Sequence, residues 1–145
     1  MAENLRVAAL YGSGRKLSAF EIAEAVDAAL EAVDLADRRH LKAGQLTLSG
    51  QKRLEIARAL ATGAQLVMLD EVMAGLNPTE ISAMLGTLER LRASRGLTFV
   101  IVEHVIGALM TLSDRILVLD HGERIAFGTP EEIGNHERVA EVYFG

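Results

Sequence analysis

The sequence predicts an α/β fold in which a mostly parallel β-sheet is flanked by helices. Two short apolar runs, residues 65–69 and 97–102, are each followed directly by charged or polar side chains, and a segment with the apolar spacing of a helix lies between them. Strands of that kind, covered on both faces and joined by a helix, run parallel and present functional residues at their carboxyl ends. We therefore expect Asp70, Glu71 and His104 at one edge of the sheet.

Length, composition and charge restrict the classes of protein to which the chain can belong. Its 145 residues are 50% hydrophobic, which is enough to bury the core of one domain. The net charge of −5 argues against a nucleic-acid-binding surface, which needs clustered lysine and arginine. The absence of cysteine excludes disulfides and thiolate metal sites. No apolar run reaches the ~18 residues that span a bilayer, and residues 1–4 do not resemble a secretory signal, so we expect a cytoplasmic location.

The chain begins with an apolar segment, residues 5–11, that leads into a glycine-containing loop ending at Lys16. This loop superficially resembles the phosphate-binding motif G-x-x-x-x-G-K-[ST]. The two positions that the motif fills with glycine are Leu10 and Arg15 here, so the match fails. We therefore predict a solvated loop without a phosphate-binding role.

Helical patterning dominates the part of the chain that follows. Ser18 and Glu21 form a predicted capping box, after which apolar residues recur at helical spacing to about Asp34. Residues 35–45 form a polar linker, and a second amphipathic helix is expected at 50–62 because its apolar residues form one stripe. These helices precede the first strand.

The second half of the chain alternates strands and helices. Asn77 is expected to cap the helix that joins the two parallel strands, with Pro78 as its first residue and Gly96 at its end. A turn at 121–122 predicts an antiparallel pair of strands. The remaining elements are expected to be a helix at 106–112, strands at 115–120 and 124–127, a short helix that begins at Thr129 and a last helix around 137–143.

Two groups of residues suit phosphate chemistry. At the end of the first strand, Asp70 can hold Mg²⁺, and Glu71 can orient or deprotonate a water molecule that attacks a phosphoryl group. The helix that opens at Ser49, Gly50 and Gln51 offers backbone N–H groups and a hydroxyl to an anion. Together these residues predict a site for a phosphate-containing ligand.

Four motifs, in this order, resemble those of the ATP-binding subunits of ABC transporters. They are similar to the LSGGQ signature and its helix (Leu48-Ser49-Gly50-Gln51, Arg53 and 57–60), Walker B (67–71), the D-loop (74–77) and the switch histidine (His104). The sequences of residues 54–58, 73–80 and 128–133 are most similar to those of the subunits that energise uptake of branched-chain amino acids. The resemblance covers nearly the whole chain.

This resemblance implies the carboxyl-terminal part of a P-loop NTPase domain of the ABC ATPase type, with a helical subdomain beside the sheet. Residues 1–63 would be the helical and signature subdomain, and residues 64–145 would run from Walker B to the end of the core. Glu71 would be the catalytic base, His104 would sense the γ-phosphate, and Asp70 would hold Mg²⁺ through water. The residues implied at the ATP are Ser49, Gly50, Gln51, Asp70 and Asn77.

The signature departs from the family pattern. Direct matching of the letters makes Ser49 the signature serine with one glycine missing, whereas counting back from Arg53 without a gap places Thr47 there. Either hydroxyl can reach a phosphate, and we favour Ser49. Arg53 and Arg58 also have a purely structural interpretation, in which they pair with acidic neighbours such as Glu55.

The family's phosphate cradle has no counterpart in these residues. The P-loop with its lysine, the adenine-stacking aromatic and the glutamine loop are all missing, so we expect weak or no binding of ATP and Mg²⁺ by this chain alone. In the family each ATP lies between the P-loop of one subunit and the signature of the other, so Ser49 can still serve a complete partner's nucleotide. Without neighbouring strands, residues 66–69 should have an unpaired edge that promotes association.

The resemblance also implies partners and a location. The partners are transmembrane permease subunits, a second ATP-binding subunit in a homo- or heterodimer and, indirectly, a periplasmic solute-binding protein; no nucleic acid is expected. The location is the cytoplasmic face of the inner membrane.

Two alternatives stay open. One is a non-catalytic partner subunit or remnant that contributes only the signature face to a complete ATPase. The other is an ATPase of this superfamily in DNA repair or translation, which the acidic charge balance disfavours.

Overall fold

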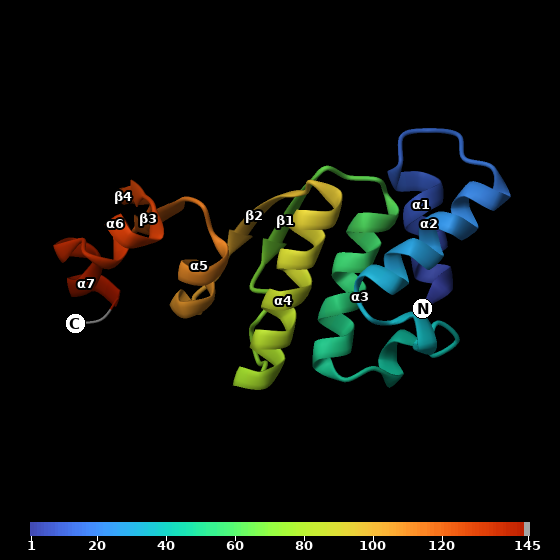
Figure 1. Ribbon diagram of the computed structural model, residues 1–145, viewed down its shortest axis with the longest axis horizontal. Coiled ribbons are helices and arrows are strands. Elements are labelled where there is room, and N and C mark those ends of the chain that lie inside the picture. The colour runs from blue at the N-terminus through green and yellow to red at the C-terminus, as the bar shows by residue number, and fades with distance from the viewer. Residues whose placement is uncertain (144–145) are drawn as a thin grey trace. The chain divides into compact units, whose positions relative to one another are not determined.

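The computed structural model describes residues 1–143, and the chain divides into two compact units, Met1–Val102 and Glu103–Gly145 (Figure 1). The first unit contains helices α1 to α4 and strands β1 and β2. The second contains helices α5 to α7 and strands β3 and β4. The division that we expected between residues 63 and 64 falls inside the first unit, and it stays a prediction.

Three helices form the amino-terminal part of the first unit. They are α1 (Ala2–Gly12), α2 (Ala19–Ala32) and α3 (Leu48–Ala61), and each contacts the other two. Their shared core includes Leu5, Leu30 and Ile56, which are at most 1% exposed. Because α1 ends at Gly12 and is a helix, the loop that leads to Lys16 is not preceded by the strand of a P-loop, and it is largely exposed as predicted.

The local signals that predicted α2 are present in the structure. Ser18 Oγ accepts a hydrogen bond from Glu21 N at 3.2 Å, and Ser18 N donates to Glu21 Oε2 at 2.7 Å, so the capping box is confirmed. The helix ends at Ala32, two residues earlier than expected. The linker that follows contains two 3₁₀ turns, Ala36–Arg38 and Ala43–Gln45.

Strands β1 (Leu66–Asp70) and β2 (Thr98–Val102) pair in parallel, as predicted, with Leu66 beside Thr98 and Asp70 beside Val102. Helix α4 (Pro78–Arg95) connects them, and Asn77 and Glu80 form its capping box. Gly96 ends this helix in the left-handed conformation that a C-terminal cap favours.

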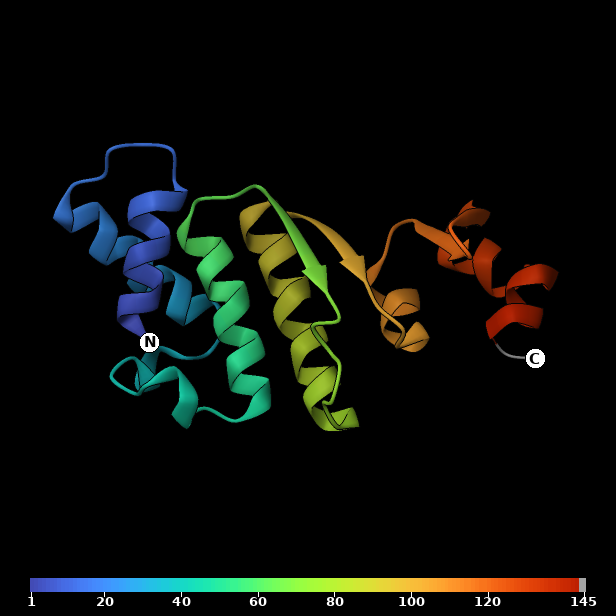
Figure 2. The ribbon, with the colours of Figure 1, turned by 180° about the vertical axis from the view of Figure 1, so that it is seen from behind.

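Our expectation that these strands are covered on both faces is wrong for one face. Helix α4 lies in front of β1 in Figure 1, whereas β1 lies in front of α4 in the reverse view of Figure 2. Val67 and Leu69 are buried, but apolar side chains of the opposite face are exposed, Met68 by 74%. The others on that face are Leu66, Val100 and Val102. Apolar content in the sequence predicted burial, but burial needs a second covering layer, and the described residues supply only one.

The second unit is a β-hairpin packed with three short helices. Strands β3 (Ile116–Asp120) and β4 (Glu123–Gly128) are antiparallel, as predicted. His121 and Gly122 form the turn, and both have positive φ, which suits the twist of a two-residue hairpin. The helices are α5 (Ile106–Leu112), α6 (Pro130–Gly134) and α7 (Glu137–Tyr143). The core of this unit contains Ile116, Val118, Ala126, Ile133 and Val139.

Helices that could cross a lipid bilayer are not found among residues 1–143, because none combines sufficient length with sufficient apolar content.

Candidate functional site

The carboxylates of the candidate site lie where strand β1 ends. Asp70 is the last residue of β1 and pairs with Val102, the last residue of β2. Glu71 extends this pairing by one step, because its N–H donates to Val102 O at 2.9 Å. The side chains of Asp70 and Glu71 are exposed, so both are accessible to a ligand. The chain continues from Val102 toward His104, which belongs to the second unit, and the role of His104 stays a prediction.

Glu71 has a left-handed backbone conformation that non-glycine residues rarely adopt. Its φ is +47°, and such conformations persist only where surrounding contacts fix them. Its N–H is held by β2, and its carbonyl oxygen accepts from Ala74 N at 3.1 Å and from Lys52 Nζ at 3.2 Å. The orientation of this glutamate therefore depends partly on Lys52, which lies on helix α3.

The amino end of helix α3 begins earlier than we expected. Leu48 is the first helical residue and Thr47 is the N-cap. Thr47 Oγ1 accepts from Gly50 N at 3.3 Å, and Thr47 O accepts from Gln51 N at 2.9 Å. The expectation that Ser49, Gly50 and Gln51 open the helix with free N–H groups is therefore wrong for Gly50 and Gln51, because the preceding threonine already accepts their hydrogen bonds.

Both candidate signature hydroxyls lie at the start of α3, but they differ in position. Thr47 stands at the cap and is exposed, whereas Ser49 lies inside the first turn and is half-buried. The Thr47 hydroxyl uses an acceptor lone pair toward Gly50, so its own hydrogen is available for donation to a ligand. This geometry favours Thr47 over our sequence preference for Ser49, although the assignment of the signature hydroxyl stays a proposal.

Helix α3 also contacts the loop between β1 and α4. Gly75 in this loop has φ of +78°, and a β-carbon there would lie 2.9 Å from Leu48 Cδ2. The backbone conformation therefore favours glycine at this position, and a larger residue would also displace the side chain of Leu48. The side chain of Asn77, which ends the loop, accepts from Glu80 N at 3.0 Å, so it caps helix α4. A contact of Asn77 with a nucleotide stays a prediction.

The contact of α3 with the loop between β1 and α4, here called the Glu71 loop, was not predicted from the sequence. Leu48 and Lys52 are four residues apart on α3, and they contact Gly75 and Glu71 respectively. The i, i+4 spacing places both side chains on one face of the helix, and that spacing was the available signal. The loop residues that they contact lie far away in the sequence, so the pairing itself was not visible.

The donor set at the strand end fits a weakly held magnesium ion. Asp70 and Glu71 offer hard carboxylate oxygens, which Mg²⁺ prefers, but the residues described contain no cluster of three or more acidic or histidine side chains that could hold a metal ion. Mg²⁺ typically keeps several waters and binds through one or two carboxylates together with phosphate oxygens. The donor set therefore fits a metal that arrives with a phosphate ligand, and the contact of Asp70 with such a metal through water stays a prediction.

Comparison with known proteins identifies relatives of this chain. The ATP-binding protein LivG for high-affinity branched-chain amino acid transport in Salmonella typhimurium is 39% identical; the match covers 99% of this chain and 61% of that protein. The corresponding protein BraF of Pseudomonas aeruginosa is also 39% identical, over 80% of this chain and 46% of that protein. The chain thus spans about half to three-fifths of the length of these relatives. No family model matches the chain.

Solved structures identify the same fold. The ATP-binding cassette MJ1267 of an ABC transporter, in its ADP conformation, superposes with a TM-score of 0.80 at 28% identity. The match covers 94% of this chain and 55% of that chain. The α/β arrangement found here is consistent with the carboxyl-terminal part of such a P-loop NTPase cassette, as expected from the sequence.

Proposed function

Because this chain is homologous to part of the ATP-binding proteins of ABC transporters, we propose that it forms the signature and Walker B portion of such a subunit. The transporter is an importer of branched-chain or related amino acids. One arrangement supports this proposal above all: strand β1 ends in Asp70 and Glu71, and helix α3 contacts the loop that follows them through Leu48 and Lys52. The candidate carboxylates and the candidate signature are therefore mechanically connected within one unit.

In the proposed reaction each residue has a distinct task. Glu71 accepts a proton from the attacking water, or orients that water, while its backbone is held by β2 and Lys52. Asp70 would hold Mg²⁺ through water, and the ion when bound would neutralise charge on the phosphate oxygens. His104 contacts the γ-phosphate. Thr47 or Ser49, with Gly50, Gln51 and Asn77, serves the nucleotide at the dimer interface.

The proposal includes partners and a location. The chain acts with transmembrane permease subunits and a second ATP-binding subunit, at the cytoplasmic face of the membrane, and a periplasmic solute-binding protein delivers the amino acid. By itself the chain binds MgATP weakly or not at all, because its 145 residues contain no G-x-x-x-x-G-K-[ST] motif. Equilibrium titration with labelled MgATP tests this last point, and micromolar affinity of the chain alone would overturn it.

The catalytic role is tested in an assembled complex that contains the chain, a complete ATP-binding subunit and the permease. Glu71→Gln should lower ATP hydrolysis by about 100-fold, because it removes the proton acceptor but keeps the size of the side chain. Glu89→Gln, an exposed position on helix α4, is the matched control and should leave the rate unchanged. Equal rates for the wild-type and Glu71→Gln complexes would reject the catalytic role.

Equal ATPase rates for the wild-type and Glu71→Gln complexes would favour the alternative, in which the chain is a non-catalytic partner that contributes only its signature face. The specific observation behind this alternative is the intact first turn of α3, with Thr47 at its cap, in a chain without a P-loop motif. The double variant Thr47→Ala/Ser49→Ala should then lower the ATPase rate of the complete partner. An unchanged rate in the mixed dimer would exclude the alternative.

A further inference from the structure

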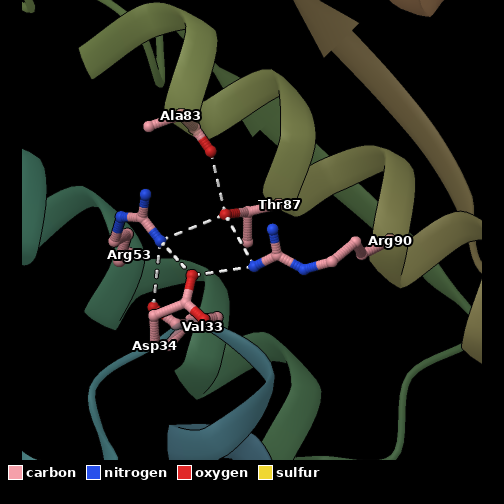
Figure 3. Close-up of polar contacts among 6 residues, drawn as sticks. All are labelled: Val33, Asp34, Arg53, Ala83, Thr87 and Arg90. Atoms are coloured by element: carbon pink, nitrogen blue, oxygen red, sulfur yellow. Dashed lines mark hydrogen bonds and ion pairs between the residues drawn. The ribbon is translucent and has the colours of Figure 1, made fainter. Parts of the chain in front are cut away.

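Helices α2, α3 and α4 of the first unit are joined by a polar network that lies outside the candidate site (Figure 3). Its four side chains are Asp34, Arg53, Thr87 and Arg90. Figure 3 shows both guanidinium groups converging on the Asp34 carboxylate and on the Thr87 hydroxyl. The network therefore connects the end of α2 with the middle of α3 and the middle of α4.

Arg53 is the buried charge of the network, with its side chain only 14% exposed. Its Nη1 donates to Val33 O at 3.2 Å, to Asp34 Oδ2 at 2.8 Å and to Thr87 Oγ1 at 3.1 Å. A charge this well buried needs paired and hydrogen-bonded partners, because the loss of one partner leaves the charge uncompensated. Our structural interpretation of Arg53, as a residue that pairs with an acidic side chain, is thus confirmed, but the carboxylate partner is Asp34 and not Glu55.

Asp34 occupies a backbone position that usually belongs to glycine. Its φ is +60°, and it follows the C-cap of α2 in a Schellman motif, with Asp34 N donating to Glu31 O and Leu35 N donating to Leu30 O. Aspartate tolerates this left-handed conformation better than most residues but less well than glycine. Its side chain offsets that penalty, because Oδ2 accepts charge-assisted bonds from Arg53 and Arg90.

Thr87 and Arg90 attach this carboxylate to helix α4. Thr87 is fully buried; its hydroxyl donates to Ala83 O at 3.0 Å and accepts from both arginines. Arg90 Nη2 donates to Asp34 Oδ2 at 2.7 Å. The buried hydroxyl of Thr87 therefore has hydrogen-bond partners both as donor and as acceptor, and it fixes the position of the Arg53 side chain against α4.

We propose that Asp34 and Arg53 are positioning residues that fix helix α3 relative to helix α4. Helix α3 carries Thr47 and Lys52 toward the Glu71 loop, and α4 begins directly after that loop, so their relative position sets how the first turn of α3 meets Glu71. This inference rests on the proposed function for its consequence in ATP turnover. The position of α3 relative to α4, which we call the α3–α4 clamp, can be measured without nucleotide.

The test uses the absence of cysteine from the chain. Cysteines introduced at the exposed positions Glu55 on α3 and Glu89 on α4 carry nitroxide spin labels, and pulsed electron resonance then gives the distribution of distances between the two helices. The test variant is Asp34→Asn, because asparagine accepts the left-handed backbone but cannot form the two ion pairs. The control is Asp27→Asn, which removes the exposed ion pair of Asp27 with Arg39 at 2.9 Å and leaves the four side chains of the network unchanged.

The inference requires that Asp34→Asn broadens the distance distribution in the folded chain while Asp27→Asn leaves it as in the wild type. In the assembled complex, Asp34→Asn should also lower the ATPase rate about tenfold, and Asp27→Asn should not. An unchanged distribution for Asp34→Asn would overturn the inference even if the melting temperature fell, since a purely stabilising role lowers stability without displacing folded helices. If Asp34→Asn does not fold, Arg90→Met, at a half-exposed position, replaces it with the same two outcomes.

The two proposals fail separately. A broadened distribution together with a wild-type complex that does not hydrolyse ATP would leave the clamp in place and reject the proposed function. A wild-type complex that hydrolyses ATP, together with an unchanged distance distribution in Asp34→Asn, would support the proposed function and reject the clamp.

Discussion

Replacing Gly75 with alanine should lower the free energy of unfolding by about 2 kcal/mol, for two separable reasons. The backbone of Gly75 has φ of +78°, and this left-handed conformation costs a residue with a β-carbon about 1 kcal/mol. The new β-carbon would also lie 2.9 Å from Leu48 Cδ2. Because Leu48 is partly exposed, its side chain can leave its preferred rotamer, which costs a further ~0.5 to 1 kcal/mol.

Gly96→Ala is the matched control for the backbone contribution. Gly96 has φ of +61°, and a β-carbon there meets no heavy atom within 4 Å, so this variant should lose only about 1 kcal/mol. Urea unfolding followed by circular dichroism measures both variants. Adding Leu48→Ala to Gly75→Ala should remove the steric part of the loss. Equal losses for Gly75→Ala and Gly96→Ala would refute the contact between the Glu71 loop and the start of α3.

Three further outcomes are expected. Glu71→Gly should raise the free energy of unfolding by about 0.5 kcal/mol in the same assay, because glycine accepts a φ of +47° without strain. Met68→Lys should change that free energy by less than ~0.5 kcal/mol but reduce self-association in sedimentation velocity, because Met68 is 74% exposed on an apolar sheet face. Hydrogen bonds from their N-cap residues lower the pKa of Glu21 and Glu132 below the usual value of 4.5. A carboxyl group with a depressed pKa in the folded state stabilises the fold at pH values above its unfolded-state pKa, and this contribution is lost as the pH falls. The double variant Glu21→Gln/Glu132→Gln should therefore lose less free energy of unfolding than the wild type between about pH 5 and pH 3.

Each of these outcomes has a contrary result. A loss of stability in Glu71→Gly would contradict the expectation that relief of backbone strain outweighs the loss of the Glu71 side chain. Unchanged association of Met68→Lys would show that the exposed face of β1 is not the surface through which chains associate, and Val67→Lys, on the buried face, should unfold the chain as a control. Parallel pH curves for the wild type and the double glutamine variant would contradict a contribution of the two capping boxes.

Short-range signals in the sequence were sufficient for most of the secondary structure. The capping boxes at Ser18 and Asn77 and the turn at 121–122 act within a few residues of the chain. The parallel pairing of β1 with β2 followed from two apolar runs joined by one helix, because parallel strands need a long crossover connection, which is usually a helix. The residues of the candidate site could likewise be identified from sequence motifs, although their roles stay predictions.

Contacts between distant segments were outside the reach of the sequence. The side chains of β1 are alternately exposed and buried because one layer of helix covers the sheet on one face only. The apolar character of Met68 and its neighbours does not reveal how many layers cover a sheet. The start of α3 at Leu48, with Thr47 as its cap, depended on which of several adjacent hydroxyls folds back onto the helix. The contact of Lys52 with Glu71 needs two elements to meet in space.

The sequence by itself determined the order and type of the elements and the positions of the candidate carboxylates, because caps, turns and apolar periodicity are local. Only the tertiary structure decided that Arg53 pairs with Asp34 and that Gly75 meets Leu48. A helix restricts the direction of a side chain but not the identity of the atom it reaches; that atom is chosen by the packing of whole helices, whose free energy is the sum of many contacts far apart in the chain.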